Sequence, residues 1–135
     1  MYDLFKKQSH RMNLAPEPFS MIKSGQKTIE LRLFDEKRQK IKVGDSIVFT
    51  ETVTGEELSV RVEKLHRFDS FETLYKVLPL LKCGYTQENV ADASPSDMDK
   101  YYSAEEQKKF GVVGIEVSLI KNQTDDNAAY APSAY

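Results

Sequence analysis

The sequence predicts an α+β fold, a small mixed β-barrel of about five strands with short helices at the connections. Several short segments alternate apolar and polar residues with a period of two, which is typical of strands with one buried face. The helical patterns between them are short, and no Gly-rich turn follows a strand, so a doubly wound nucleotide-binding fold is not expected. A chain of 135 residues is long enough for one domain with its own hydrophobic core.

The first elements are a strand and a short helix. Residues 11–14 are predicted to form the strand, and Pro16-Glu17-Pro18 to begin the helix, because proline fits a first helical turn and a carboxylate there suits the helix dipole. Phe19 and Ile22 mark the side of this helix that we expect to be buried. Gly25 stands where a left-handed C-cap is expected, so the helix leads directly into the next strand.

That strand begins at Lys27 and carries charge on one face. Its aliphatic residues alternate with polar residues, so an extended chain places the two sets on opposite sides. One strand therefore presents a carboxylate and a guanidinium side by side, with an ammonium at its start. The aliphatic set is Ile29, Leu31 and Leu33, and the polar set is Thr28, Glu30 and Arg32.

The middle of the chain predicts a hairpin. Residues 43–45 are expected to turn, and the apolar residues of 47–49 and 58–62 predict two strands paired around Thr54-Gly55. The period-two pattern breaks near residues 63–64, which predicts a β-bulge or bend of the kind that helps to close a small barrel.

A helix and a long irregular segment follow. Asp69 with Glu72 resembles a capping box, and it starts a helix that Pro79 stops. Residues 80–102 show weak patterning, so we expect mostly irregular structure there, with one helical turn near 87–91. A connection of this length in a small domain is usually functional or a lid.

The domain is assigned to residues 10–120, and it closes with a helix and a strand. Ser103 with Glu106 predicts the capped start of that helix, and the alternating residues of 113–119 predict the last strand. Two further segments fall outside the domain. These are residues 1–9, an N-terminal extension with a short amphipathic turn, and residues 121–135, whose Asn, Asp, Ala and Ser predict a disordered tail.

Composition narrows the class of protein. The chain is 40% hydrophobic and 30% charged, and no apolar run approaches the length of a membrane span, so no membrane partner is expected. The start of the chain lacks the apolar region of a signal peptide. With one cysteine, Cys83, an internal disulfide is impossible, and a cytoplasmic location is the simplest expectation.

Charge is uneven along the chain. Residues 1–67 carry 13 Lys and Arg against 10 Asp and Glu, whereas residues 68–135 carry 6 against 11. The basic run of residues 37–42 lies in the positive half; it can contact phosphates, although a solvated loop is the simpler interpretation. The pI near 5.7 argues against a protein that coats nucleic acid through bulk electrostatics.

Residues that bind metals are scattered, so neither a metal site nor a cofactor is predicted. His10 and His66 are isolated, and the pattern of zinc deaminases is absent. His66 is interpreted as a surface or structural histidine. Cys83 is interpreted as a small buried hydrophobe, because no histidine is placed to activate it.

Lys27, Glu30 and Arg32 are the candidate functional side chains, and two interpretations stay open. The charges are those of an ordinary solvated strand face, or they bind one small polar group, since residues two apart on a strand are about 7 Å apart. In a cleft, Arg32 suits a phosphate or carbonyl, while Glu30 suits an amine or the role of a base. Bases also stack on aromatic rings, which makes Tyr85, Tyr101 and Tyr102 ligand-binding candidates, with one of the adjacent pair expected in the core. Thr28 shares the polar strand face.

The pattern Gly25-x-Lys27-x-x-Glu30-x-Arg32 resembles the G-x-K-x-x-E-x-R signature of the ASCH domain family, which is similar in fold to PUA-like β-barrels of RNA-binding and RNA-modifying proteins. The resemblance extends over about residues 10–120. It implies a cleft beside the signature that binds RNA or a nucleoside, with Lys27, Glu30 and Arg32 on its wall.

The resemblance also implies possible activities. Some family members resemble nucleoside amidohydrolases that remove an acyl group from N4-acetylcytidine with a lysine, a threonine and a glutamate, and others are reported as ribonucleases. This chain keeps the lysine at Lys27, but it carries Glu30 where the hydrolase threonine aligns, and Thr28 would need a shifted geometry. The hydrolytic glutamate has no clear match; Glu88 is merely nearby.

Three hypotheses follow. The first is a binding module for RNA, a nucleotide or a modified nucleoside, in which Lys27 and Arg32 hold phosphate or carbonyl oxygens and a tyrosine stacks. The second is a small hydrolase with Lys27 and Glu30 as its acid/base pair, acting on an acylated cytidine or on RNA. The third is that the segment only stabilises the barrel. No pattern sets the oligomeric state.

Overall fold

The computed structural model describes residues 6–121. Residues 1–5 of the predicted extension, and the predicted tail from residue 122 on, lie outside the described residues. Within the described part the strands and α-helices are β1 (Ser9–Leu14), α1 (Pro16–Ser24), β2 (Ile29–Leu33), β3 (Ser46–Glu51), β4 (Glu57–Phe68), α2 (Phe71–Val77), α3 (Ala104–Phe110) and β5 (Val112–Leu119). Four 3-10 helices join them: η1 (Arg38–Lys40), η2 (Leu80–Lys82), η3 (Val90–Asp92) and η4 (Pro95–Lys100).

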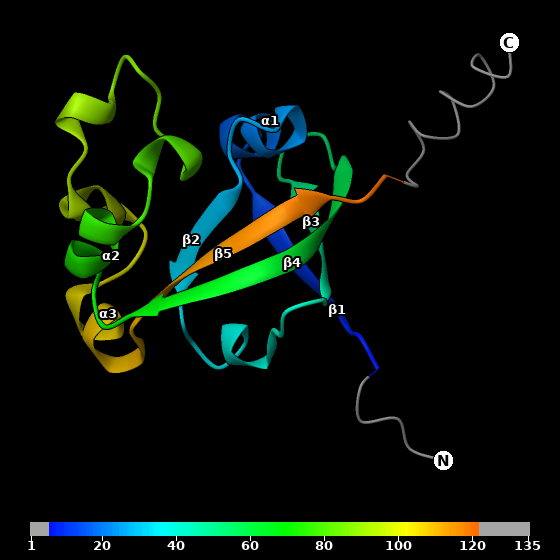
Figure 1. The fold of residues 1–135 in the computed structure, drawn as a ribbon, viewed down its shortest axis with the longest axis horizontal. Helices are drawn as coiled ribbons and strands as arrows, with labels where there is room; N and C mark the ends of the chain where they lie inside the picture. Colours follow the sequence, from blue (N-terminus) through cyan, green and yellow to red (C-terminus); the bar gives the residue numbers. More distant parts are fainter. Residues whose placement is uncertain (1–5, 122–135) are drawn as a thin grey trace, which may run out of the picture.

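The five strands form one sheet in the order β1-β3-β4-β5-β2, which curls into a half-barrel (Figure 1). β1 pairs with β3 in parallel, and the other pairs are antiparallel. The predicted α+β barrel-type fold is therefore confirmed, and the register of β4 against β5 shifts between Val62 and Lys64, where the bulge was predicted. β1 and β2 are the two edges of the sheet, and we call the space between these edges the seam.

Two hydrophobic clusters pack on the two faces of the sheet. One fills the concave face under α1, and the other lies between the opposite face of β2 and β5 and the helices α2, η4 and α3 (Figure 1). The aliphatic face of β2 belongs to the second cluster, so its polar face points to the concave side of the half-barrel, as the alternation predicted. The second cluster is centred on Ile29, Leu31, Leu33, Phe71, Leu74, Cys83, Met98 and Val112.

The first strand and the first helix agree with the prediction except at the start of β1. β1 begins at Ser9, two residues early, because its pairing with β3 extends to Ser46; residues 6–8 adopt no regular secondary structure, so the predicted turn is absent there. α1 begins at Pro16 and ends at Gly25, whose φ of 88° is the predicted left-handed C-cap. The Gly25 N–H donates to the Ile22 carbonyl.

Side-chain caps set the starts of the later α-helices. α3 starts with the predicted capping box of Ser103 and Glu106. The prediction that Asp69 caps α2 was wrong by one residue, since the Ser70 side chain accepts the Thr73 N–H and occupies the N-cap. Ser70 is followed by Phe71, which is 1% exposed, so the cap position lets the helix bury that ring.

The segment of residues 80–102 is irregular, as predicted, but it is closely hydrogen-bonded. The helical turn expected near residues 87–91 overlaps η3, whereas η4 was not predicted. η4 begins with a capping box of Ser94 and Asp97, a local signal that the proline and polar residues around it obscured. Among the helices of the described residues, none combines the length and the apolar character needed to cross a bilayer.

Candidate functional site

A cavity of about 660 Å3 lies at the seam. This volume is within the roughly 300–1,000 Å3 range of ligand pockets. Ten lining residues come from β1, α1, β2 and the connections between them, namely Asn13, Leu14, Ala15, Glu17, Pro18, Met21, Lys27, Glu30, Leu31 and Arg32. The opposite wall consists of Tyr75, Cys83, Gly84, Tyr85, Asn89, Asp97, Met98, Lys100, Tyr101 and Tyr102.

The turn from α1 into β2 places Lys27 in the cavity wall. The Lys27 N–H donates to the Met21 carbonyl of α1 at 3.0 Å, and the Thr28 N–H donates to the Lys82 carbonyl at 2.9 Å. The beginning of β2 is thus fixed both to α1 and to the opposite wall. A Cβ on Gly84 would stand 3.5 Å from Lys27 Nζ, so the backbone of that wall comes close to the ammonium.

Lys27, Glu30 and Arg32 converge in the cavity. Lys27 Nζ lies 2.7 Å from Glu30 Oε1, and Arg32 Nε lies 2.6 Å from Glu30 Oε2. The side chains are 10%, 6% and 13% exposed, so they do not form a solvated strand face. One buried carboxylate therefore holds two cations, and the three charges sum to +1.

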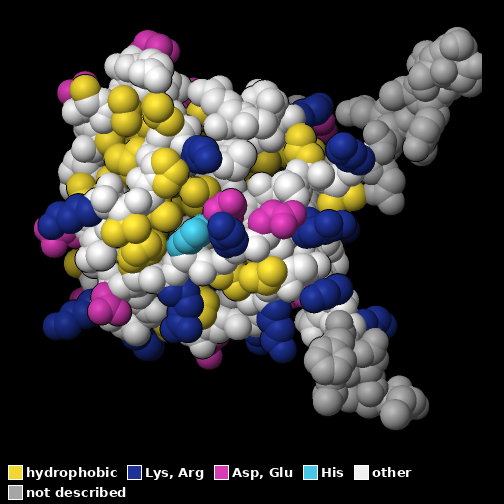
Figure 2. Space-filling view, in the orientation of Figure 1, with side chains coloured by type: hydrophobic (Ala, Val, Ile, Leu, Met, Phe, Trp, Pro, Cys, Tyr) yellow, Lys and Arg dark blue, Asp and Glu magenta, His cyan; other side chains and the backbone are white. Residues whose placement is uncertain are grey.

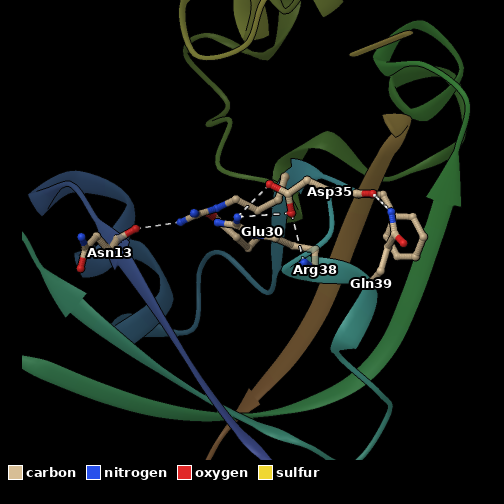
Figure 3. Close-up of polar contacts among 7 residues, drawn as sticks. Asn13, Glu30, Asp35, Arg38 and Gln39 are labelled. Carbon is tan, nitrogen blue, oxygen red and sulfur yellow. Dashed lines mark hydrogen bonds and ion pairs between the residues drawn. The ribbon is translucent and has the colours of Figure 1, made fainter. Parts of the chain in front are cut away.

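Arg32 also bridges the seam. Its Nη2 donates to the Asn13 carbonyl at 2.8 Å, a contact that Figure 3 draws from the Asn13 backbone toward the Glu30 site. The Leu14 carbonyl accepts from Thr52 beyond β3, so the preceding carbonyl faces the open edge of β1, where sheet pairing cannot satisfy it. Arg32 thus connects the two edge strands of the half-barrel.

The position of Glu30 on the sheet explains its pKa. Glu30 pairs with Ile115 of β5, and residues opposite each other share a face, so its side chain stands on the concave, buried side. Burial acts to raise the pKa of this carboxyl, but the charges and hydrogen bonds of Lys27 and Arg32 outweigh it and hold the pKa below its usual value. Glu30 is ionised at neutral pH.

A chain of hydroxyl contacts builds the opposite wall. The Tyr75 and Tyr85 hydroxyls lie 2.7 Å apart, and the Tyr85 hydroxyl donates to Asp97 Oδ2 at 2.6 Å. The hydrogen bond from Tyr85, together with the Ser94 N–H, holds the pKa of Asp97 below its ordinary value, while burial raises the pKa of Tyr85. The chain ties η4 to α2 across residues 80–102.

Two adjacent tyrosines play different structural parts at the cavity. Tyr102 stacks on Phe71, with 6.2 Å between ring centroids, so one of the pair packs against the core, as predicted. Tyr101 is 63% exposed, and Lys100 Nζ lies 5.2 Å from its ring centroid. The exposed ring and the ammonium border the cavity together.

Thr28 and Glu88 do not line the cavity, although both lie near it in the sequence. Cys83 does line it, but it is 5% exposed, and burial raises the pKa of its thiol to about 11. The thiol is therefore protonated at neutral pH, in agreement with the prediction of a small buried hydrophobe.

Neither His10 nor His66 lines this cavity. His66 Nε2 of β4 lies 2.9 Å from Glu116 Oε1 of β5, which is consistent with a structural histidine, and His10 Nε2 lies 2.8 Å from Asp45 Oδ2. Within residues 6–121, no group of three or more His, Cys, Asp or Glu side chains is arranged to hold a metal ion.

Sequence reasoning missed three features of the cavity: the Asn13 carbonyl, Tyr75 and Asp97. The first depends on which edge of β1 is unpaired, which no local pattern reports. Tyr75 looks like one more residue of an amphipathic helix. Asp97 carried the one usable signal, since Ser94 and Asp97 have capping-box spacing.

A curled five-stranded half-barrel with a charged cavity at its seam defines the class of α+β, PUA-like folds. The particular family follows from the sequence: a family model for the ASCH domain matches residues 12–121, and the chain belongs to the ASCH domain family. This confirms the resemblance carried by Gly25, Lys27, Glu30 and Arg32.

Two solved structures are similar to the whole domain. The crystal structure of hypothetical protein PH0355 is 33% identical, with a TM-score of 0.69, over 83% of this chain and 99% of that one. The solution structure of protein PF0455 from Pyrococcus furiosus is also 33% identical, with a TM-score of 0.66, over 84% of this chain and 98% of that one. A search of curated proteins found no significant match.

Proposed function

We propose that the seam cavity binds RNA, a nucleotide or a modified nucleoside. The observation that carries this proposal is the pair of nearly buried cations, Lys27 and Arg32, that share the single carboxylate of Glu30. Two cations on one anion leave an excess positive charge in a partly desolvated cavity, which favours a phosphate or another electron-rich group. ASCH domains are generally thought to bind RNA, which is consistent with this proposal.

Each side chain has a distinct part in the proposed site. Lys27 and Arg32 hold phosphate or carbonyl oxygens, and Glu30 fixes the positions of both cations. Tyr101 supplies an exposed ring on which a base stacks, while Tyr85 and Tyr102 form fixed walls. Thr28 binds ligand only through a shift of β2, because its side chain lies outside the present cavity lining.

A hydrolase that uses Lys27 and Glu30 is the alternative, and we favour binding over it. A general base works best with a pKa near the working pH, whereas the pKa of Glu30 is lowered and both of its oxygens contact cations. Release of acetate from N4-acetylcytidine, or cleavage of a short RNA, would reverse this preference if Glu30→Gln abolished the reaction in a folded protein. As a separate point, we propose that the protein is located in the cytoplasm.

The test compares cavity cations with surface cations. Lys27→Met and Arg32→Met remove one charge each and keep an aliphatic stem. We expect each to weaken binding of single-stranded RNA and ribonucleotides at low salt by at least about tenfold, as for the loss of a hydrogen bond to a charged group. Fluorescence anisotropy measures the RNA, and calorimetry measures the nucleotides.

The matched controls are Lys64→Met and Arg61→Met on β4. Both side chains are exposed and lie outside the cavity, yet each substitution changes the net charge by the same amount. Equal losses in the controls and the cavity variants would show that bulk charge alone drives binding. Unchanged binding in the cavity variants would show that the ligand binds elsewhere.

A further inference from the structure

Charged residues continue along the chain after β2, outside the cavity lining. Asp35 and Arg38 follow Arg32, and the Arg38 backbone N–H and Nη1 each lie 3.1 Å from an Asp35 carboxylate oxygen. Asp35 thereby fixes η1 and the Arg38 guanidinium in place. In the view of Figure 3, Asp35 and Arg38 lie on the side of Glu30 away from Asn13.

Arg38 holds a donor that the protein does not use. Its side chain is 15% exposed, and among the buried side-chain nitrogen and oxygen atoms of residues 6–121, Arg38 Nε alone lacks a hydrogen-bond partner. Buried donors in folded proteins are nearly always satisfied, by protein, water or ligand. Because Nε is buried, an acceptor from outside reaches it only when the Arg38 side chain shifts away from Asp35.

Tyr102 is influenced by charges inside the cavity and by charges outside its lining. This tyrosine lines the cavity, and the charges that act on its hydroxyl are those of Arg32, Glu30, Arg38 and Asp35. Burial is the larger influence and raises its pKa. The charges of Arg32 and Arg38 thus both act on Tyr102, although only Arg32 lines the cavity.

More cations continue from this point. Lys37, Lys40 and Lys42 are exposed in and beside η1. Figure 2 shows Lys and Arg side chains gathered along the lower part of the molecule, where Figure 1 places this segment. Lys27 and Arg32 within the cavity are sufficient to bind the phosphate of a free nucleotide. Cations beyond the cavity suit a ligand that carries several phosphates along its length.

We propose that the ligand is a single-stranded RNA chain rather than a free nucleotide, and that Arg38 with Lys37 and Lys40 binds its phosphodiester backbone where it leaves the cavity. This inference rests on the proposed function, because it requires one nucleotide of the strand to occupy the cavity. Arg38 binds one phosphate once its side chain has shifted to expose Nε, and the lysines bind the next phosphates as point charges. The contacts are independent of base identity.

The experiment compares a monomer with a polymer of the same nucleotide. Adenosine, cytidine and uridine 5′-monophosphates and the matching homopolymeric ribo-octamers are titrated into the full chain over a range of salt concentrations. We expect the octamers to bind more tightly and with a steeper salt dependence. Arg38→Gln should weaken octamer binding about tenfold, reduce its salt slope by roughly 0.7, and leave monophosphate binding unchanged.

A second variant tests the same path without changing a partly buried side chain of η1. Lys37→Gln/Lys40→Gln changes only exposed side chains, and it should weaken the octamers but not the monophosphates. Arg61→Gln, a charge-matched substitution on β4, should alter neither. Thermal melting shows whether Arg38→Gln remains folded.

The outcomes separate this inference from the proposed function. If monophosphates bind but octamers bind no tighter, or if the Arg38 and lysine variants change nothing, the backbone path is overturned and the cavity proposal stands. Equal weakening of both probes by Arg38→Gln would overturn the path as well, since Arg38 would then act on the cavity. If no probe binds, both proposals are wrong.

Discussion

Glu30 is the residue on which the chemistry of the cavity depends. Its carboxylate is shared by Lys27 and Arg32, and without it two nearly buried cations would repel each other. A buried charge is tolerated only when it is paired and hydrogen-bonded, so the position of each cation follows from the carboxylate between them. The same pairing lowers the pKa of Glu30, so the residue is better suited to hold cations than to accept a proton.

We predict that Glu30→Gln destabilises the protein in a pH-dependent way. At pH 7 it should lower the free energy of unfolding by about 3 kcal/mol, because removing one partner of a buried ion pair leaves its partners uncompensated. The folded-state pKa of Glu30 lies below its ordinary value of 4.5, so its contribution is complete above that value and disappears as the pH falls through the folded pKa. The difference between wild type and variant should therefore shrink in acid.

Urea denaturation at pH 7 and at acidic pH measures this difference. Glu36→Gln, a substitution of an exposed glutamate in the next loop, is the control and should change stability by less than about 0.5 kcal/mol. A deficit for Glu30→Gln that stays constant across the pH range would contradict the assignment of its stabilising role to ionisation.

At the scale of elements, the junction of α1 and β2 positions the site. α1 ends at Gly25 in a left-handed conformation, and only two residues later Lys27 enters the cavity wall. Pro16 and Gly25 are strong local signals, and the sequence predicted this helix and its end correctly for that reason. The cap of α2 was misplaced because Asp69 and Ser70 are both good N-caps, and only the burial of Phe71 selects between them.

Local sequence patterns do not predict the cavity itself. The charged face of β2 was predicted from alternation, but its burial was not, because burial depends on β2 and β1 being the two edges of one curled sheet. The Asn13 carbonyl and the Tyr75–Tyr85–Asp97 chain join residues that are 10 to 19 positions apart in the sequence, beyond the reach of helix and strand periodicity. Pairwise contacts of this kind follow from topology, and a single sequence carries no direct record of them.

Gly25 and Gly55 provide a matched test of the junction. Both have positive φ, 88° and 78°, and a Cβ at either position would meet nothing within 4 Å. We predict that Gly25→Ala and Gly55→Ala each lower the free energy of unfolding by about 1 kcal/mol through backbone strain alone. Only Gly25→Ala should weaken ligand binding, because only the turn at Gly25 orients Lys27 toward the cavity.

Chemical denaturation and RNA titration of the two variants check this prediction. Gly55 lies in the β3–β4 turn, outside the cavity lining, so the control shares the backbone cost and differs only in location. Equal binding by both variants would mean that β2 keeps Lys27 in place without help from the α1 cap.

At the scale of the whole molecule, the cavity joins two differently built halves. The half-barrel supplies the cations from β2 and the turn that precedes it, and residues 80–102 supply a wall whose order comes from side-chain hydrogen bonds. Arg32 closes the barrel side by linking β2 to Asn13, while Tyr85 closes the other side by linking η4 to α2. The wall is therefore a preformed surface rather than a loose lid, although fewer regular elements support it.

We predict that Tyr85→Phe loosens this wall without unfolding the barrel. The substitution removes the donor to Asp97 and the partner of the Tyr75 hydroxyl, so both are left without these contacts in a partly buried place. Hydrogen exchange should become faster in residues 94–102, while β3, β4 and β5 keep their protection, because local opening requires only the breaking of local contacts. Tyr101→Phe, which removes a hydroxyl from an exposed ring, should leave exchange unchanged. Faster exchange in all strands would show instead that the wall and the barrel unfold as one unit, and then ligand binding at the seam would stabilise both halves together.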